Sequence, residues 1–230
     1  LSAQSGPLFQ HFMASIPCVQ EELARVGAAL IKLMKEEQAK GAPDATFFEI
    51  DAFDGTNART LAAHSDTPLR TYPCSPNPAN KEPFETYANR AQSDYAATSF
   101  FELPTLIPGF EEGFDFVYEM AAFQFYGPER LEHLNRVAHY MKSNGIAVFL
   151  EKMNHQDEGE YLLREMAKDT KFKDRYFTRD EIEWKTSNFL HSMRKGQVTL
   201  AEFVRAAEQV FASVKVIWHS TNFYEVVASN

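Results

Sequence analysis

Short apolar runs alternate with amphipathic segments between residues 45 and 152, and this alternation constrains the fold more than any other feature of the chain. The runs are almost continuously apolar, as strands buried on both faces of a sheet are. Such an order is typical of a parallel sheet with crossover helices. We predict strands at residues 46–51, 69–73, 95–100, 114–119 and 145–151.

The segments that flank this core have a different pattern. The first helix is predicted to start at Ser15-Ile16-Pro17, because proline suits a first helical turn. Two later segments, Thr178–Glu181 and Thr199–Glu202, match the capping box of a helix N-terminus. We found no repeat or linker and predict one domain of 230 residues. Its parts are an N-terminal helical lid (1–44), a core (45–152), a helical insert (153–212) and a closing antiparallel hairpin (213–230).

Charge and composition exclude several classes of protein. The net charge is −9 with a pI near 5.3, so the average field repels nucleic acid. Two cysteines, Cys18 and Cys74, are too few for a disulfide framework or a four-ligand zinc site. No apolar run approaches the roughly 18 residues that span a bilayer, and the start of the chain lacks a secretory pattern. We predict a reduced, cytoplasmic setting with no membrane contact.

One stretch, FFEIDAFDGTNARTLAAHS at residues 47–65, has the order of a buried strand, a tight turn and a helix. In nucleotide-binding α/β folds such a turn is rich in glycine. Here a single glycine, Gly55, remains, and aspartates stand where glycines are expected. The turn is therefore either a cofactor loop with altered residues or an ordinary turn that binds nothing.

The order of elements resembles class I S-adenosylmethionine-dependent methyltransferases over nearly the whole chain. The segment EIDAFDG, residues 49–55, aligns with that family's E-I-G-x-G-x-G motif. Glu49 and Gly55 match, whereas Asp51 and Phe53 replace two glycines. FDFVYEM, residues 114–120, resembles the family's fourth-strand motif. The resemblance implies that residues 45–152 form a nucleotide-binding core and that S-adenosylmethionine is the cofactor.

The resemblance also implies a set of cofactor-binding residues. Asp51 would pair with the ligand's ammonium group, and the aromatic segment after the third strand would contact adenine. The family's ribose-binding acid is missing from TYPCSP, residues 71–76, where Ser75 offers one weaker hydrogen bond. The expected cofactor-binding residues are Glu49, Asp51, Gly55, Ser75, Ser99, Phe100, Glu119 and Met120.

Within this superfamily, the C-terminal half is most similar to the branch that makes carboxy-S-adenosylmethionine. The similarity rests on residues 123–152, the helical insert and STNFYEVVAS at residues 220–229. The arginine with which that branch holds the extra carboxylate aligns with Thr186. This difference favours plain methyl transfer or another ligand.

Other candidate residues are chosen by their place in the predicted fold. Glu151 and His155 come directly after the fifth strand, beside the expected substrate cleft, and are candidate general bases. Residues 154–160 gather a histidine and three acids, but their spacing matches no standard metal signature, so we predict no metal site. The candidate substrate-binding residues, for which core packing is the alternative explanation, are Phe123, Tyr126, Trp184 and His191.

The sequence thus predicts an α/β fold with a doubly wound, mainly parallel, seven-stranded sheet and a terminal antiparallel hairpin. The predicted function is S-adenosylmethionine-dependent methyl transfer to a small molecule. The alternative is a pseudo-methyltransferase, which keeps the fold and binds a partner protein or another ligand. The lost glycines and the missing ribose acid favour this alternative. The oligomeric state is open, with a homodimer as one option.

Overall fold

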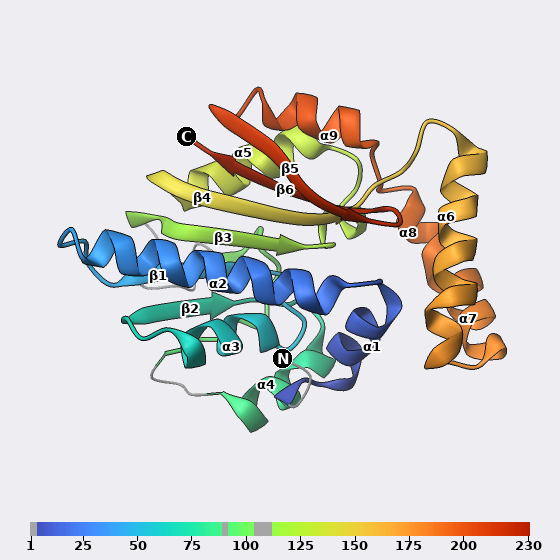
Figure 1. Cartoon of the computed structure of the whole chain (residues 1–230), viewed down its shortest axis with the longest axis horizontal. Helices are drawn as coiled ribbons and strands as arrows, with labels where there is room; N and C mark the ends of the chain where they lie inside the picture. The colour runs from blue at the N-terminus through green and yellow to red at the C-terminus, as the bar shows by residue number, and fades with distance from the viewer. Residues whose placement is uncertain (1–3, 89–91, 104–111) are drawn as a thin grey trace.

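The computed structural model of the chain describes residues 4–88, 92–103 and 112–230. Its centre is a six-stranded sheet in the order β2-β1-β3-β4-β6-β5 (Figure 1). The first four strands of this order are parallel, and the last two form the predicted antiparallel hairpin at the edge. The strands are β1 (Ala45–Ile50), β2 (Leu69–Pro73), β3 (Phe114–Met120), β4 (Met141–Lys152), β5 (Ser213–Ser220) and β6 (Phe223–Ser229).

Helices cover both faces of the sheet (Figure 1). One face carries α1 (Pro7–Ser15), α2 (Val19–Gln38) and α3 (Thr56–His64). The other carries α5 (Arg130–Tyr140) and α9 (Leu200–Ala207). The remaining helices are α4 (Lys81–Tyr87), α6 (Glu158–Lys171), α7 (Arg179–Lys185) and α8 (His191–Arg194). Short turns of helix are η2 (Pro78–Asn80), η5 (Phe123–Phe125), η6 (Lys173–Arg175) and the π-helical η7 (Thr186–Leu190).

The apolar strands are explained by burial on both faces. In β1, Phe47 belongs to the core under α1, α2 and α3, whereas its neighbour Phe48 belongs to the core under α5 and α9. The same alternation holds in β4 for Val148 and Phe149. Successive side chains of a strand point to opposite faces, so a strand covered by helices on both sides needs apolar residues at every position.

The strand predicted at residues 95–100, the third in chain order, is absent from the sheet, which therefore has six strands and not seven. This part of the chain instead makes two isolated parallel bridges with β2, from Thr71 to Ser93 and from Cys74 to Ala96. The chain therefore passes beside β2 for a few residues and turns away before a regular strand is established.

Pro73 in β2 explains why these bridges do not join into a strand. The Asp94 amide donates to the Thr71 carbonyl (2.9 Å) and the Ala96 amide to the Pro73 carbonyl (3.0 Å). A regular parallel ladder needs a hydrogen bond in the reverse direction between these two, from the amide of residue 73. Proline has no N–H, so the ladder lacks that hydrogen bond.

Two helix boundaries also differ from the prediction. The N-terminal region forms two helices, and the predicted start at Ser15-Ile16-Pro17 is the break between α1 and α2. Cys18, with φ of +60°, turns the chain there. The helix before the fifth predicted strand also ends early, because α5 ends at Tyr140 and β4 begins at Met141, four residues before the predicted start at 145.

Both predicted capping boxes are confirmed. The Thr178 side chain accepts from the Glu181 amide, and the Glu181 carboxylate accepts from the Thr178 amide in return. Thr199 and Glu202 make the same exchange at the start of α9. The two capped helices differ in burial, since α9 buries Phe203 in the core and α7 buries none of its residues.

This difference leads to a prediction about stability. Thr199→Ala should lower the free energy of unfolding by about 1 kcal/mol, the usual contribution of such a cap. Thr178→Ala should change it by less than about 0.5 kcal/mol, because fraying of an exposed helix is not coupled to the core. Urea denaturation followed by circular dichroism measures both. An equal loss in the two variants would show that α7 unfolds together with the sheet.

Candidate active site

The loop between β1 and α3 has an unusual backbone. Asp51, Phe53 and Gly55 have φ angles of +47°, +50° and +68°, all in the left-handed region. These are the three positions at which the methyltransferase motif carries glycine. A left-handed conformation costs a residue with a Cβ roughly 1 kcal/mol or more. The loop therefore keeps a glycine-type backbone although two of its glycines are replaced.

Contacts around the loop explain how this conformation is held. The Phe53 ring packs against the rings of Phe9 and Phe12 in α1, with centroids 5.7 and 5.2 Å away. Gly55 lies against β2 and α4, where an added Cβ would come within 3.0 Å of Pro73 and 3.1 Å of Phe84. Gly55 is thus required for close packing as well as for its φ angle.

The start of the chain also fastens this loop. The Asp54 carboxylate accepts from the Gly6 amide through one oxygen, and from the Thr56 hydroxyl through the other (2.6 Å). Arg59 in α3 lies 3.5 Å from the same carboxylate and donates to the Gln4 carbonyl (3.0 Å). These contacts between residues 4–6 and the loop were not predicted, since residues 4–6 have no sequence motif of their own.

Two acids at the end of β1 and in the loop after it, the buried Glu49 and the half-buried Asp51, have no cation within ion-pair distance among the described residues. Glu49 is fully buried, and its Oε2 accepts from the Ala58 amide at 3.0 Å. Its Oε1 has no hydrogen-bond partner among the described residues. Burial raises the pKa of Glu49 to about 8, although the Ala58 amide, the Asn57 side chain and the charge of Arg59 lower it. Burial likewise raises the pKa of Asp51 to about 7, although the hydrogen bond from Tyr126 lowers it.

Two further acids lie at the ends of β3 and β4. Glu119 accepts from the Ala122 amide, and Glu151 accepts from the Phe123 amide at 3.1 Å. Burial, together with the neighbouring Glu151 carboxylate, raises the pKa of Glu119 well above its usual value. Arg130 neutralises Glu151 across 3.1 Å and is itself buried. Arg130 was missed from the sequence, where it is one of several charged residues at the start of an amphipathic helix.

An aromatic cluster adjoins these acids. The Tyr126 hydroxyl donates to both oxygens of Asp51, at 3.0 and 2.9 Å. The Tyr126 ring meets those of Phe100 and Phe101 at 5.1 and 5.0 Å, and Phe100 meets Phe123 at 5.8 Å. The predicted adenine contact Phe100 and the predicted substrate residues Phe123 and Tyr126 therefore form one cluster, linked to the loop after β1 through Asp51.

The other predicted cofactor residues are engaged elsewhere. The buried Ser75 hydroxyl accepts from the Asn80 side chain (2.9 Å). Ser99 is half-buried in a turn, where its carbonyl accepts from the Glu102 amide (3.1 Å). Met120 is buried in the core under α1, α2 and α3. The structure does not bring these three side chains into the cluster of acids and aromatic rings.

The predicted residues of the helical insert lie at its surface. Trp184 is 61% exposed, and His191 is exposed as well. The His155 ring accepts from the Asp157 amide (3.0 Å) and so completes the turn that starts α6. The Thr186 hydroxyl donates to the Ile182 carbonyl one turn earlier (2.8 Å).

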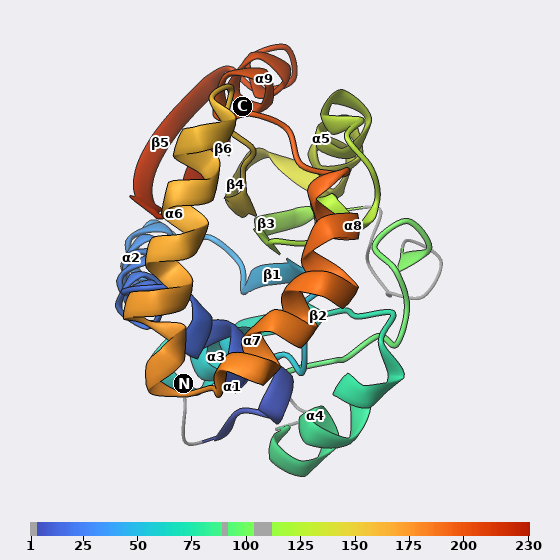
Figure 2. The ribbon, with the colours of Figure 1, turned by 90° about the vertical axis from the view of Figure 1, so that its right-hand side faces the viewer.

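The helical insert lies over the carboxyl ends of the parallel strands. Figure 2 looks onto this edge and shows α6, α7 and α8 towards the viewer, with β1 visible between α6 and α8 and with α1 near the bottom. His11 of α1 packs on Phe177, 4.2 Å between ring centroids, and contacts the Lys185 ammonium of α7. Helix α1 therefore touches both the loop after β1 and the insert.

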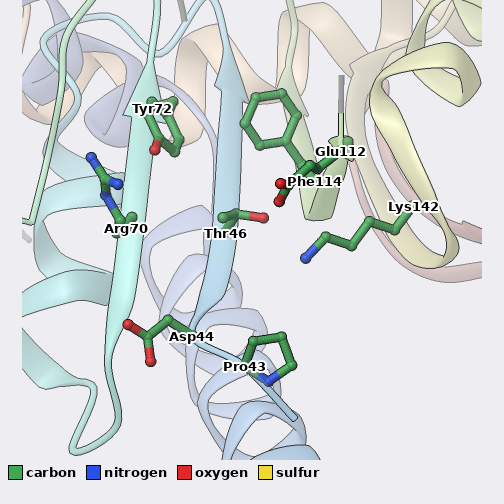
Figure 3. A pocket seen from close by; sticks show the side chains of 9 residues that line it. Pro43, Asp44, Thr46, Arg70, Tyr72, Glu112, Phe114 and Lys142 are labelled. Carbon is green, nitrogen blue, oxygen red and sulfur yellow. The ribbon is translucent and has the colours of Figure 1, made fainter. Parts of the chain in front are cut away.

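Two cavities lie away from this edge. One, of about 160 Å³, opens at the amino ends of the strands and is lined by Thr46, Arg70 and Lys142 among others (Figure 3). The other, of about 350 Å³, lies between α2 and α3 beside Gly27 and Leu61. Neither is lined by a predicted cofactor-binding or substrate-binding residue.

Residues 4–88, 92–103 and 112–230 contain neither a membrane-spanning helix nor a group of metal-binding side chains. None of the helices described there combines the length and the apolar character that crossing a bilayer requires. In the same ranges, no three His, Cys, Asp or Glu side chains are grouped so that they could hold a metal ion.

Comparison with known proteins identifies the fold. No protein family matches the chain, and no curated protein sequence resembles it significantly. Solved structures do match. A possible exported protein from Bordetella parapertussis gives a TM-score of 0.62 at 13% identity, covering 97% of this chain and 72% of that one.

Two methyltransferases match in the same way. The plantazolicin methyltransferase BamL, in complex with S-adenosylhomocysteine, gives a TM-score of 0.59 at 9% identity over 83% of this chain and 65% of its own. Geranyl diphosphate C-methyltransferase from Streptomyces coelicolor A3(2) gives 0.52 at 9% identity over 87% and 74%. The fold is that of class I S-adenosylmethionine-dependent methyltransferases. At these identities the likeness establishes the fold and leaves activity to be proposed.

The half-buried acid Asp51 yields a prediction about pH. Its pKa is about 7 in the folded protein, against 3.8 ordinarily, so the folded state holds this proton more tightly than the unfolded state does. The stability it contributes is full below about pH 4 and is lost as the pH rises through about 7. Asp51→Asn cannot ionise and should be more stable than the wild type at pH 8, by on the order of 1 to 3 kcal/mol. Urea denaturation at pH 5 and pH 8 measures the difference, and equal pH slopes for the two proteins would contradict it.

Proposed function

We propose that this chain is an S-adenosylmethionine-dependent methyltransferase acting on a small molecule. The supporting observation is the loop after β1. Its three left-handed residues stand at the glycine positions of the family motif, next to the buried Glu49 with an unpartnered oxygen. Residues kept in such a costly conformation beside buried acids are typical of ligand-binding sites.

The charges at this edge suit the cofactor. Glu49 and Asp51 have no cation within ion-pair distance among the described residues, and a bound ammonium group would stabilise both as carboxylates. We propose that these two acids hold the methionine end and that Phe100 lies against the adenine. The cofactor would supply an electrophilic methyl group. No acid is present for the ribose, and Ser75 is occupied by Asn80, so the ribose would be held less tightly.

The aromatic cluster suits the methyl acceptor. Phe123 and Tyr126, with Phe100 and Phe101, would exclude water from the acceptor and orient it. Glu151 is committed to Arg130 and the Phe123 amide, and His155 is committed to its turn. We therefore propose that the rate comes from positioning and desolvation, with neither residue acting as an obligatory base.

Thr186 bears on the kind of group transferred. Its hydroxyl is used within its own helix, and it offers no charge for an extra carboxylate on the cofactor. We propose transfer of a plain methyl group. A small-molecule substrate, a cytoplasmic location and a homodimer remain predictions that belong to this proposal.

A specific observation also favours the pseudo-methyltransferase alternative. The Phe53 ring is packed under α1, and Asp54 is engaged by the Gly6 amide and the Thr56 hydroxyl. These contacts give the loop a second reason to be ordered, one that needs no ligand. The two functions differ in whether the loop acids contact a cofactor.

Calorimetric titration with S-adenosylhomocysteine separates them. We expect the wild type to bind with a Kd below about 1 mM. Asp51→Asn, which keeps the shape and removes the charge, should weaken binding by 1 to 3 kcal/mol, or roughly 5- to 150-fold. Asp66→Asn is the matched control, because Asp66 is 77% exposed and pairs with Lys35 at the surface.

The contrary outcome is equally clear. If millimolar S-adenosylhomocysteine gives no heat with the wild type, and Asp51→Asn changes only stability, the loop has lost its cofactor. The pseudo-methyltransferase function would then replace the proposal.

A further inference from the structure

Four lysines gather between the helical insert and the end of β4. Lys152 ends β4, Lys168 lies in α6, Lys173 in η6 and Lys185 in α7. The first three are at most 3% exposed. Lysine is almost never buried in this way unless it is paired, because removing an ammonium group from water costs several kcal/mol.

Only two carboxylates face these four ammonium groups within the described part of the chain. Glu165 binds Lys152 at 2.7 Å and Lys168 at 2.6 Å, and Asp169 binds Lys173 at 2.7 Å. Burial alone would raise the pKa of Glu165, but Lys168 and Lys152 together lower this pKa to about 2. Among the same described residues, Lys185 has no acid within ion-pair distance.

The contact of Lys185 is instead a neutral ring. Its ammonium meets Nε2 of His11, whose pKa is lowered to about 4 by burial and by Lys185. Burial and the neighbouring lysines also lower the pKa of Lys185 to about 7. Glu181, an acid whose charge acts on His11, is exposed and forms the cap of α7 with Thr178. The cluster therefore carries more positive than negative charge.

The place of this cluster connects it to the candidate active site. Lys152 directly follows Glu151 at the carboxyl end of β4. His11 is in α1, whose Phe12 packs on Phe53 of the cofactor loop. Helices α6 and α7, which carry Lys168 and Lys185, lie at the edge where the parallel strands end (Figure 2).

We propose that Lys185, Lys173 and His11 form a binding site for an oxyanion, a carboxylate or a phosphate, carried by the substrate. The assignment to a substrate rests on the proposed methyl transfer, whereas the anion site itself does not. An oxyanion bound there would supply the missing negative charge and accept hydrogen bonds from the two ammonium groups. It would also accept one from the imidazole once His11 is protonated.

The alternative is that Lys185 resolves the imbalance by losing its proton, with no ligand involved. The two cases differ in their response to anions. The charges of Lys168, Lys173 and Lys152 disfavour the protonated forms of Lys185 and His11. A bound oxyanion would counteract this repulsion, so Lys185 and His11 would take up protons when it binds. The response to sulfate, which keeps its charge, should then be larger at pH 6 than at pH 8.5.

Thermal unfolding in sulfate, against chloride of equal ionic strength, tests the site. About 50 mM sulfate should raise the Tm of the wild type by a few degrees through mass action. Lys185→Met should lose most of this shift, and Lys185→Arg should retain it. The matched control is Lys32→Met, which removes the same charge from a side chain that is 79% exposed. If Lys185→Met does not fold, Lys185→Gln takes its place, since its amide can still meet His11.

The proposal is overturned if sulfate does not raise the Tm of the wild type, or raises that of Lys185→Met as much as that of Lys32→Met. Repeating the measurement with inorganic phosphate and with acetate distinguishes a phosphate site from a carboxylate site. Titration of the wild type with S-adenosylhomocysteine, beside its response to sulfate, separates the two proposals. Cofactor binding without a sulfate response removes the anion site alone, and a sulfate response without cofactor binding removes the methyltransferase.

Discussion

Uncompensated negative charge at the carboxyl ends of β1, β3 and β4 is the constraint on which the rest of the structure depends. Glu49, Asp51, Glu119 and Glu151 are grouped there, and only Glu151 has a charged partner, Arg130, within the described part of the chain. Burying a carboxylate in this way is costly unless it is protonated or meets a cation. The raised pKa values of Glu49 and Asp51 show that protonation is the solution available to the protein alone. A cationic ligand would be the other solution.

The helical insert and the end of β4 present the opposite imbalance. Their lysines outnumber the acids that face them, and Lys185 rests against a neutral histidine. Helix α1 joins the two regions, because its Phe12 packs on the loop after β1 and its His11 on the insert. With a cation bound at the acids of the strand ends and an anion bound at the lysines of the insert, this edge would suit a cationic methyl donor and an anionic acceptor together. Each half is testable without the other.

The sequence predicted much of the fold because the signals involved are local. Alternating apolar runs gave the parallel strands, and Thr178 and Thr199 marked two helix starts. The strand predicted at residues 95–100 does not form, because Pro73 of β2 has no N–H to pair with residues 93–96. This proline is visible in the sequence. Its effect depends on which strand is the neighbour, and that is known only from the folded chain.

The candidate site was predictable in part for the same reason. The motif gave the positions of Asp51 and Phe53, but not that their backbone stays left-handed or that α1 holds the Phe53 ring. The pairing of Tyr126 with Asp51, and of Lys185 with His11, joins residues far apart in the chain. Trp184, a candidate substrate-binding residue from its place in the helical insert, is left exposed by the structure.

The most direct test of the account is carbon-13 NMR of the side-chain carboxyl of Asp51, titrated with and without S-adenosylhomocysteine. The account predicts that this carboxyl titrates near pH 7 in the free protein. Saturation with the ligand should move the transition down by at least about 1 pH unit, because a bound ammonium group favours the carboxylate. A titration that the ligand leaves unchanged would contradict the claim that these buried acids form a cofactor site.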